Sequence, residues 1–108
     1  MTKPRGAIAV LFLSTRNAND PEGYDAAAEA MDAEASSQPG YLGIDSVRAA
    51  DGEGITVSWW ADEASALAWR AHVGHSEVRE KGRSDWYDRY QVIVTEVVRS
   101  YDWSAGEA

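Results

Sequence analysis

Two histidines, His72 and His75, are the only imidazoles in the chain, and they stand three positions apart. Imidazole exchanges protons near neutral pH, so either side chain could act as a general base. Two imidazoles at this spacing on a continuous helix could also share a metal ion. Gly74 interrupts the helix between them, and no third ligand follows at a motif spacing. We therefore predict no metal site, and a catalytic base, a structural residue and a surface residue stay open for each histidine.

A second candidate group is Thr56, Ser58 and Trp60, which share one face of a predicted strand because side chains alternate along it. The opposite face carries the apolar set Ile55, Val57 and Trp59. Two hydroxyls and an indole N–H in an apolar pocket suit the orientation of a phenol or quinone. If the apolar set packs on the helices, the first set lines a cavity. The alternative is that Trp60 is a core aromatic residue whose N–H is satisfied locally.

Aromatic and basic residues also gather before the last predicted strand: Trp86, Tyr87 and Tyr90 beside Arg83 and Arg89. One interpretation is a lid, with arginine holding an anionic or phenolic substrate and with Tyr87 and Arg83 as substrate-binding residues. The other, which composition favours, is packing between two subunits, since interfaces are enriched in aromatic residues and arginine.

Four predicted strands and two predicted helices must position these side chains. A run without alternation over residues 6–16 predicts a strand buried on both faces. Asp20 and Pro21 are a helix N-cap and first position, and this helix should end by Ser37. Residues 41–48 and 55–60 form a hairpin, with glycines in the Asp51–Gly54 loop supplying positive φ angles.

The second half of the chain predicts a helix and a long strand. Asp62 caps a helix that Gly74 interrupts, and a second helical piece runs over residues 75–81 until Gly82 stops it. Ser84 caps one short turn that carries Trp86 and Tyr87. The last strand is expected over residues 90–101, with Trp103 closing it and a frayed tail behind.

The predicted order of elements is βαββαβ, which is the ferredoxin-like α+β arrangement with four antiparallel strands and both helices on one face. The other face of such a sheet would carry apolar residues that a lone monomer could not leave in water. Two sheets packed face to face would enclose a barrel. We therefore expect a homodimer with a dimeric α+β barrel.

The length and composition of the chain limit the functions that it could have. The chain forms one domain, residues 1–108, with a core of about residues 6–103. Its 18 acidic and 10 basic residues give a net charge of −8, which disfavours nucleic acid because phosphate contacts need Lys or Arg. It has no cysteine, no apolar run near the roughly 20 residues of a membrane span, and no convincing signal peptide. We expect a cytoplasmic protein that binds neither nucleic acid nor membrane.

Several residue groups are distinctive together: Pro39-Gly-Tyr-Leu-Gly, Gly54-Ile-Thr-Val-Ser-Trp-Trp, Ala68-Trp69, and Gly82-Arg83 with Trp86-Tyr87. This set resembles the antibiotic biosynthesis monooxygenase domain family, over nearly the whole chain. The resemblance implies a dimeric α+β barrel with a cavity between sheet and helices in each subunit. Activities in this family range from cofactor-free oxidation of aromatic polyketides to haem degradation and quinol oxidation, so the fold does not choose among them.

The resemblance also suggests site residues. Members that oxidise polyketides use an asparagine and a tryptophan in the third strand; Trp60 matches the tryptophan, and Thr56 stands where the asparagine would be. Members that degrade haem use a tryptophan in the second helix, which Trp69 matches. Those members also use an asparagine in the first strand and an axial histidine after the tryptophan. Here the first predicted strand has no asparagine, and the position of the axial histidine falls on Val78 or Arg79.

Three functions follow as hypotheses. The first is a cofactor-independent monooxygenase that oxidises a small phenol, quinol or polyketide, with His72, His75 and Trp60 as catalytic candidates. Its substrate-binding candidates are Thr56, Ser58, Trp69, Tyr87 and Arg83. The second is a haem-binding or haem-degrading protein, which the residues do not favour. The third is a non-enzymatic dimeric protein that binds small molecules.

Overall fold

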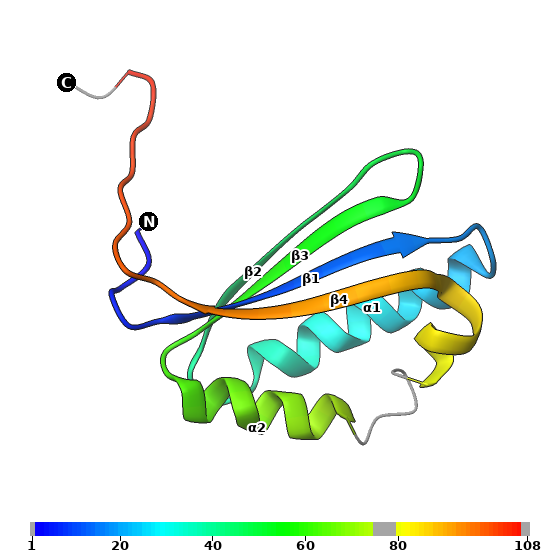
Figure 1. Cartoon of the computed structure of the whole chain (residues 1–108), viewed down its shortest axis with the longest axis horizontal. Helices are drawn as coiled ribbons and strands as arrows, with labels where there is room; N and C mark the ends of the chain where they lie inside the picture. The colour runs from blue at the N-terminus through cyan, green and yellow to red at the C-terminus, as the bar shows by residue number, and fades with distance from the viewer. Residues whose placement is uncertain (1, 75–79, 107–108) are drawn as a thin grey trace.

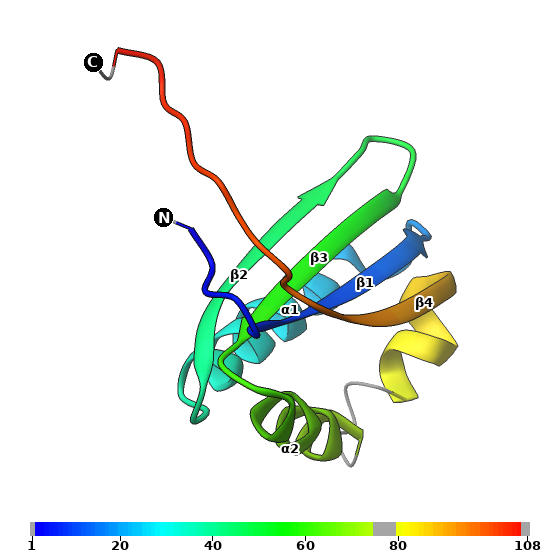
Figure 2. The ribbon, with the colours of Figure 1, turned by 60° about the vertical axis from the view of Figure 1, so that its left-hand side comes forward.

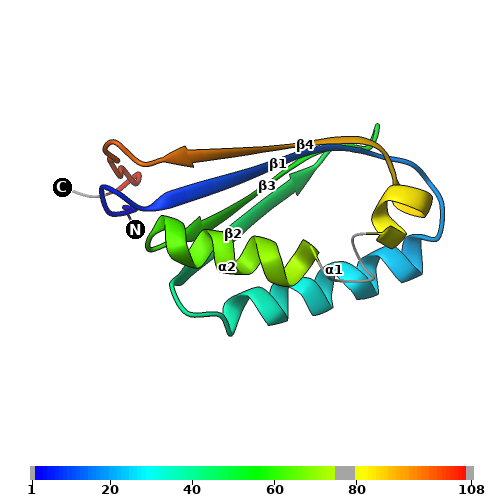
Figure 3. The same ribbon diagram turned by 60° about the horizontal axis from the view of Figure 1, so that its bottom comes forward.

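The fold is a single antiparallel sheet covered on one side by two helices, as seen in a computed structural model that describes residues 2–74 and 80–106. The elements in order are β1 (Ile8–Arg16), α1 (Pro21–Ser36), β2 (Tyr41–Arg48), β3 (Glu53–Trp60), α2 (Glu63–Gly74), a π-turn η1 (Gly82–Trp86) and β4 (Tyr87–Glu96) (Figure 1). The strand order is β2-β3-β1-β4. Both helices lie under the same face (Figure 3). The predicted ferredoxin-like βαββαβ fold is confirmed.

Both helices start at the residues that the sequence predicts. The Asp20 carboxylate accepts a hydrogen bond from the Gly23 N–H at 3.2 Å, and Pro21 takes the first helical position. At α2 the Asp62 carboxylate accepts the Ser65 N–H at 2.8 Å. This backbone hydrogen bond, supported by the Ser65 hydroxyl, lowers the pKa of Asp62. Each carboxylate therefore satisfies an N–H that the first helical turn leaves unpaired.

Strand register decides which side chains face the helices. In the pairing of β1 with β3, Ile8 lies opposite Trp60, Val10 opposite Ser58 and Phe12 opposite Thr56. Directly opposed residues share a face, and Ile8 and Trp60 belong to the core together with Ala35 of α1 and Ala66 of α2. The helix-covered face thus carries Thr56, Ser58 and Trp60.

The apolar set of β3 lies on the opposite, uncovered face, which we call the open face. Ile55, Val57 and Trp59 alternate with the core residues and pair with residues 13, 11 and 9 of β1. The possibility that Ile55, Val57 and Trp59 pack against the helices, considered from the sequence, is therefore wrong. The reason is that β3 puts its bulkiest buried side chain, Trp60, with no exposed surface, against the helices. The two adjacent tryptophans do point to opposite faces.

The last strand is shorter than the sequence predicts. β4 ends at Glu96, which pairs with Ile8 at the start of β1. Beyond it only the Val97 N–H to Ala7 carbonyl and Gly6 N–H to Val97 carbonyl bonds continue the pairing. The predicted strand to Tyr101 is wrong because β1 offers no further partner residues. Residues 97–106 instead run away from the sheet (Figure 2), with Tyr101 and Trp103 each 82% exposed.

The connection from α2 to β4 also differs from the prediction. Most of the expected helical piece over residues 75–81 lies outside the described residues. Gly82 does not stop the helix, because η1 begins there and Lys81 and Asp85 form an ion pair across the turn at 2.8 Å. The Ser84 hydroxyl donates to the Lys81 carbonyl rather than capping a new turn. Tyr87 is already the first residue of β4.

Candidate active site

The helix-covered face has two chemically different ends. At one end, which we call the tryptophan end, Trp60 lies beneath both helices with no exposed surface. Its Nε1 donates to the Ser58 hydroxyl at 3.0 Å. Its ring stacks on Trp69 of α2 at 5.8 Å between centroids and meets Tyr41 edge to face at 5.8 Å. Three candidate residues, Trp60, Ser58 and Trp69, therefore lie together, and Trp60 is packed as a core residue with its N–H satisfied.

His72 continues this aromatic stack toward solvent. Its ring lies parallel to that of Trp69, with centroids 5.5 Å apart. Its Nε2 lies 2.8 Å from the Glu34 carboxylate of α1, and both side chains are about half exposed. His72 therefore links the two helices at the surface. The other histidine candidate, His75, lies outside the described residues.

The middle of the face carries hydroxyl groups among apolar side chains. Thr56 and Ser46 of the neighbouring strand form a hydrogen bond at 2.7 Å between their hydroxyls. In β1, Phe12 lies directly opposite Thr56, and Val10 lies opposite Ser58. Phe12 packs in turn against the rings of Tyr87 and Tyr90, with centroids 5.3 and 5.1 Å away. Thr56 thus stands between the tryptophan end and a second aromatic group.

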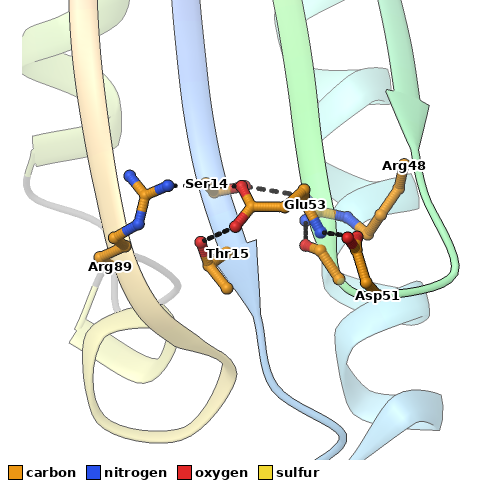
Figure 4. A network of polar contacts seen from close by, with 7 residues as sticks. Ser14, Thr15, Arg48, Asp51, Glu53 and Arg89 are labelled. Atoms are coloured by element: carbon orange, nitrogen blue, oxygen red, sulfur yellow. Dashed lines mark hydrogen bonds and ion pairs between the residues drawn. The ribbon is translucent and has the colours of Figure 1, made fainter.

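At the far end of the same face, polar and aromatic residues meet in what we call the arginine end: Ser14, Arg16, Tyr24, Arg48, Trp86 and Tyr87. The Arg48 guanidinium donates to the Ser14 hydroxyl at 2.8 Å and to the Gly52 carbonyl at 2.5 Å (Figure 4). Arg16 stacks on the Tyr24 ring, with 3.8 Å from its Cζ to the centroid. The eight residue steps from Ile8 to Arg16 along β1 put the two ends roughly 26 Å apart.

Tyr87 is held in its neutral form at the arginine end. Burial, and then its hydrogen bond with Tyr24, raises the pKa of its phenol, although the guanidinium charges of Arg48 and Arg16 act in the opposite direction. Its hydroxyl is therefore a hydrogen-bond donor throughout the physiological range. The predicted substrate-binding residue Tyr87 thus lies apart from Trp60, at the other end of the face.

Arg83, by contrast, lies at the surface. Its Nε donates to the Tyr90 hydroxyl at 2.6 Å, and its Nη1 lies 3.8 Å from the Glu80 carboxylate. The hydrogen bond to Tyr90 raises the pKa of Arg83. Its side chain is about half exposed, so it flanks the aromatic cluster rather than entering it.

The open face has its own polar contacts and a hollow. Glu53 accepts a hydrogen bond from the Thr15 hydroxyl at 2.8 Å and lies 3.4 Å from the Arg89 guanidinium (Figure 4). Beside this group is a depression of about 720 Å³ whose walls include Leu13, Val47 and Ile55. Val47 is 70% and Ile55 42% exposed in the single chain.

Among residues 2–74 and 80–106, no three His, Asp or Glu side chains converge as metal ligands. No helix in that part of the chain is long and apolar enough to cross a membrane.

Comparison with known proteins identifies the family of the chain. The model of the family described as antibiotic biosynthesis monooxygenase matches residues 7–81. The chain belongs to this family. A Bacillus subtilis (strain 168) protein named Uncharacterized protein YqjZ is 50% identical over 91 residues, which cover 84% of this chain and 79% of its own.

Solved structures agree with the family fold. The cofactor-independent oxygenase SnoaB from Streptomyces nogalater superimposes with a TM-score of 0.70 at 13% identity, over 94% of this chain and 99% of its own. A putative antibiotic biosynthesis monooxygenase from Nitrosomonas europaea gives 0.74 at 9% identity, over 91% and 96%. At these identities the likeness establishes the fold alone.

Sequence reasoning did not predict four residues of the arginine end: Ser14, Arg16, Tyr24 and Arg48. One signal was available, since Ser14 and Arg16 are polar residues on the helix-facing positions of a strand that is otherwise apolar there. Polar side chains at such positions lie between the sheet and the helices in this fold.

Proposed function

We propose that this chain is a cofactor-independent oxygenase that oxidises a small hydroxylated aromatic between the sheet and the helices. The observation that carries the proposal is the composition of the helix-covered face, where aromatic rings, hydroxyl groups and two guanidinium groups alternate from Trp60 to Arg16. Such a surface orients an aromatic ring and stabilises a developing oxyanion. The shared fold with SnoaB, described as a cofactor-independent oxygenase, supports the same reaction class.

The proposed reaction needs no reductant beyond the substrate. A hydroxylated anthrone loses a proton to give a carbanion or phenolate, which transfers an electron to dioxygen. A carbon–oxygen bond then forms, and loss of water leaves a carbonyl, so that the CH₂ group and O₂ give C=O and H₂O. The protein binds and orients the substrate, excludes water and stabilises negative charge.

Named residues take different parts in this proposal. Trp60 and Trp69 form the packed wall at one end, Ser58 and Thr56 supply hydroxyls along the floor, and Tyr87 places a neutral phenol at the other end. His72, and His75 outside the described residues, are the candidate bases. Arg83 flanks the site from the surface.

We also propose that two copies pair through the open face. Leu11, Val57, Ile55 and Val47 line it as a contiguous apolar surface, and a stable soluble monomer rarely exposes so large a patch. Light scattering should give twice the chain mass of 11.8 kDa. Ile55→Lys puts a charge into this surface and should yield a monomer.

A matched control for the dimer experiment is Leu67→Lys. Leu67 is 54% exposed on α2, close to the 42% of Ile55, but it lies away from the open face. The Leu67→Lys protein should stay dimeric. A wild-type monomer at micromolar concentration would overturn the pairing, as would dissociation by both variants alike.

Oxygen uptake tests the proposed activity. Colourless, chelator-treated protein should consume oxygen with a hydroxylated anthrone or quinol, at a rate that rises with pH through the ionisation of the substrate. A hemin titration in parallel tests the haem hypothesis, which predicts a Soret shift at stoichiometric hemin. Binding of aromatics without any oxygen uptake would instead establish a non-enzymatic binding protein.

A further inference from the structure

Two donor nitrogens of the Arg16 guanidinium are buried and have no hydrogen-bond partner in the described part of the chain. Its Nε and Nη2 are shielded from solvent and donate to no hydrogen-bond acceptor within residues 2–74 and 80–106. The same holds for the indole Nε1 of Trp86, a residue that is 4% exposed. A buried donor left unpaired is costly, and more so when it carries charge. In native proteins such buried donors are paired with a protein group, an ordered water, an ion or a ligand.

The geometry of the unpaired donors identifies the kind of occupant. Nε–H and Nη2–H lie on the same edge of a guanidinium and point in parallel, which matches the two oxygens of a carboxylate. Arg16 is fixed by stacking at 3.8 Å on the Tyr24 ring, and Trp86 meets the same ring edge to face at 5.7 Å. The three unpaired donors thus belong to two residues that contact the same aromatic ring.

The charges near Arg16 also favour an anionic ligand. Arg48, the second cation of the arginine end, donates to the neutral acceptors Ser14 and Gly52. Among the described ion pairs, neither Arg16 nor Arg48 contacts a carboxylate. Glu53, which follows Gly52 in the chain, is engaged with Arg89 on the open face. Within the described residues, two guanidinium groups therefore stand without a counter-ion, in a protein whose net charge is −8.

From these observations we infer that the arginine end binds the carboxylate of an aromatic acid. The Nε–Nη2 edge of Arg16 takes both carboxylate oxygens, and the ring of the acid lies among Tyr24, Trp86 and Tyr87. The inference rests on the proposed function, because it names the substrate class as aromatic acids. Arg16 and Tyr24 are each partly exposed, so the cluster reaches the surface at the loop end of the sheet.

Calorimetric titration with 2-naphthoate and its uncharged isostere 2-naphthamide tests the inference without turnover. The wild-type protein should bind the acid about 10–100-fold more tightly than the amide, since the acid alone pairs with the guanidinium. Arg16→Met should remove this preference. Arg16→Lys keeps the charge but loses the two parallel N–H donors of the guanidinium, and should weaken naphthoate binding about 10-fold. Arg89→Met, a change at an arginine on the open face, should leave binding unchanged.

Thermal unfolding separates a ligand site from a structural arginine. Without ligand, Arg16→Met should melt at the wild-type temperature or above, because an unmatched buried charge is replaced by an apolar side chain. It should also lose the rise in melting temperature that naphthoate gives the wild type. A lower melting temperature for both Arg16 variants, or equal binding of acid and amide, would overturn the inference.

The inference and the proposed function fail in different ways. Selective naphthoate binding without oxygen uptake on any phenolic acid supports the carboxylate site and contradicts the oxygenase. Oxygen uptake by a protein that binds acid and amide alike supports the oxygenase and contradicts the carboxylate site.

Discussion

Trp60→Ala is expected to destabilise the protein by roughly 3–5 kcal/mol, the usual cost of removing a large aromatic side chain from a core. Trp60 has no exposed surface and contacts Tyr41 and Trp69 through its ring. Its loss also leaves the buried Ser58 hydroxyl without the indole donor. Urea unfolding followed by circular dichroism measures the change.

Trp103→Ala is the matched control, since the same side chain is 82% exposed there and should cost little. Both variants are best compared in the monomeric Ile55→Lys background, so that dimer dissociation does not contribute to the measured stability. Trp60→Phe then separates packing from chemistry, because it fills most of the volume and lacks the N–H. Equal stability of the Trp60→Ala and Trp103→Ala proteins would show that Trp60 is not a core residue.

Gly52→Ala is the second change with a large expected effect. Gly52 adopts a φ of +97°, and an added Cβ would run into the Arg16 carbonyl oxygen. The Gly52 carbonyl itself accepts the Arg16 N–H at 2.9 Å and the Arg48 guanidinium. The substitution should therefore cost about 2 kcal/mol or more from backbone strain and contact together. It should also displace both arginines and abolish the preference for naphthoate.

Gly6→Ala controls for the backbone angle in this experiment. Gly6 has a similar φ of +89°, but nothing lies within 4 Å of its added Cβ. It should therefore lose only the conformational part of the stability and keep ligand selectivity. If the two alanine variants are equally stable and equally selective, the close approach of the hairpin loop to Arg16 plays no part in the site.

The sequence allowed the strands and helix starts to be predicted because their determinants are local. Asp20 and Pro21 fix the start of α1, and Asp62 fixes that of α2. Of the two hairpin glycines expected at positive φ, Gly52 adopts such an angle in the loop, whereas Gly54 lies within β3 and does not. Alternation also placed Thr56 and Trp60 on one face correctly. Which face the helices cover was not predicted, because both faces of β3 carry large apolar side chains and only packing with α1 and α2 decides between them.

The arginine end could not be predicted because it depends on strand register. Arg48 and Ser14 are 34 positions apart and meet because Gly54 pairs with both. Tyr24 joins them only through the packing of α1. The end of β4 was missed for a similar reason: the valine-rich run continues to Val98, but its partner strand does not.

Isotopic labelling of the product tests the central claim, cofactor-independent oxygenation, most directly. Metal-free, colourless protein is incubated with a hydroxylated anthrone under ¹⁸O₂, and the product is analysed by mass spectrometry. Cofactor-independent oxygenation should place one ¹⁸O atom in the new carbonyl and the other in water, with a yield that chelator does not lower. Product without ¹⁸O, no product above the buffer background, or turnover that chelator abolishes and added metal restores would contradict it.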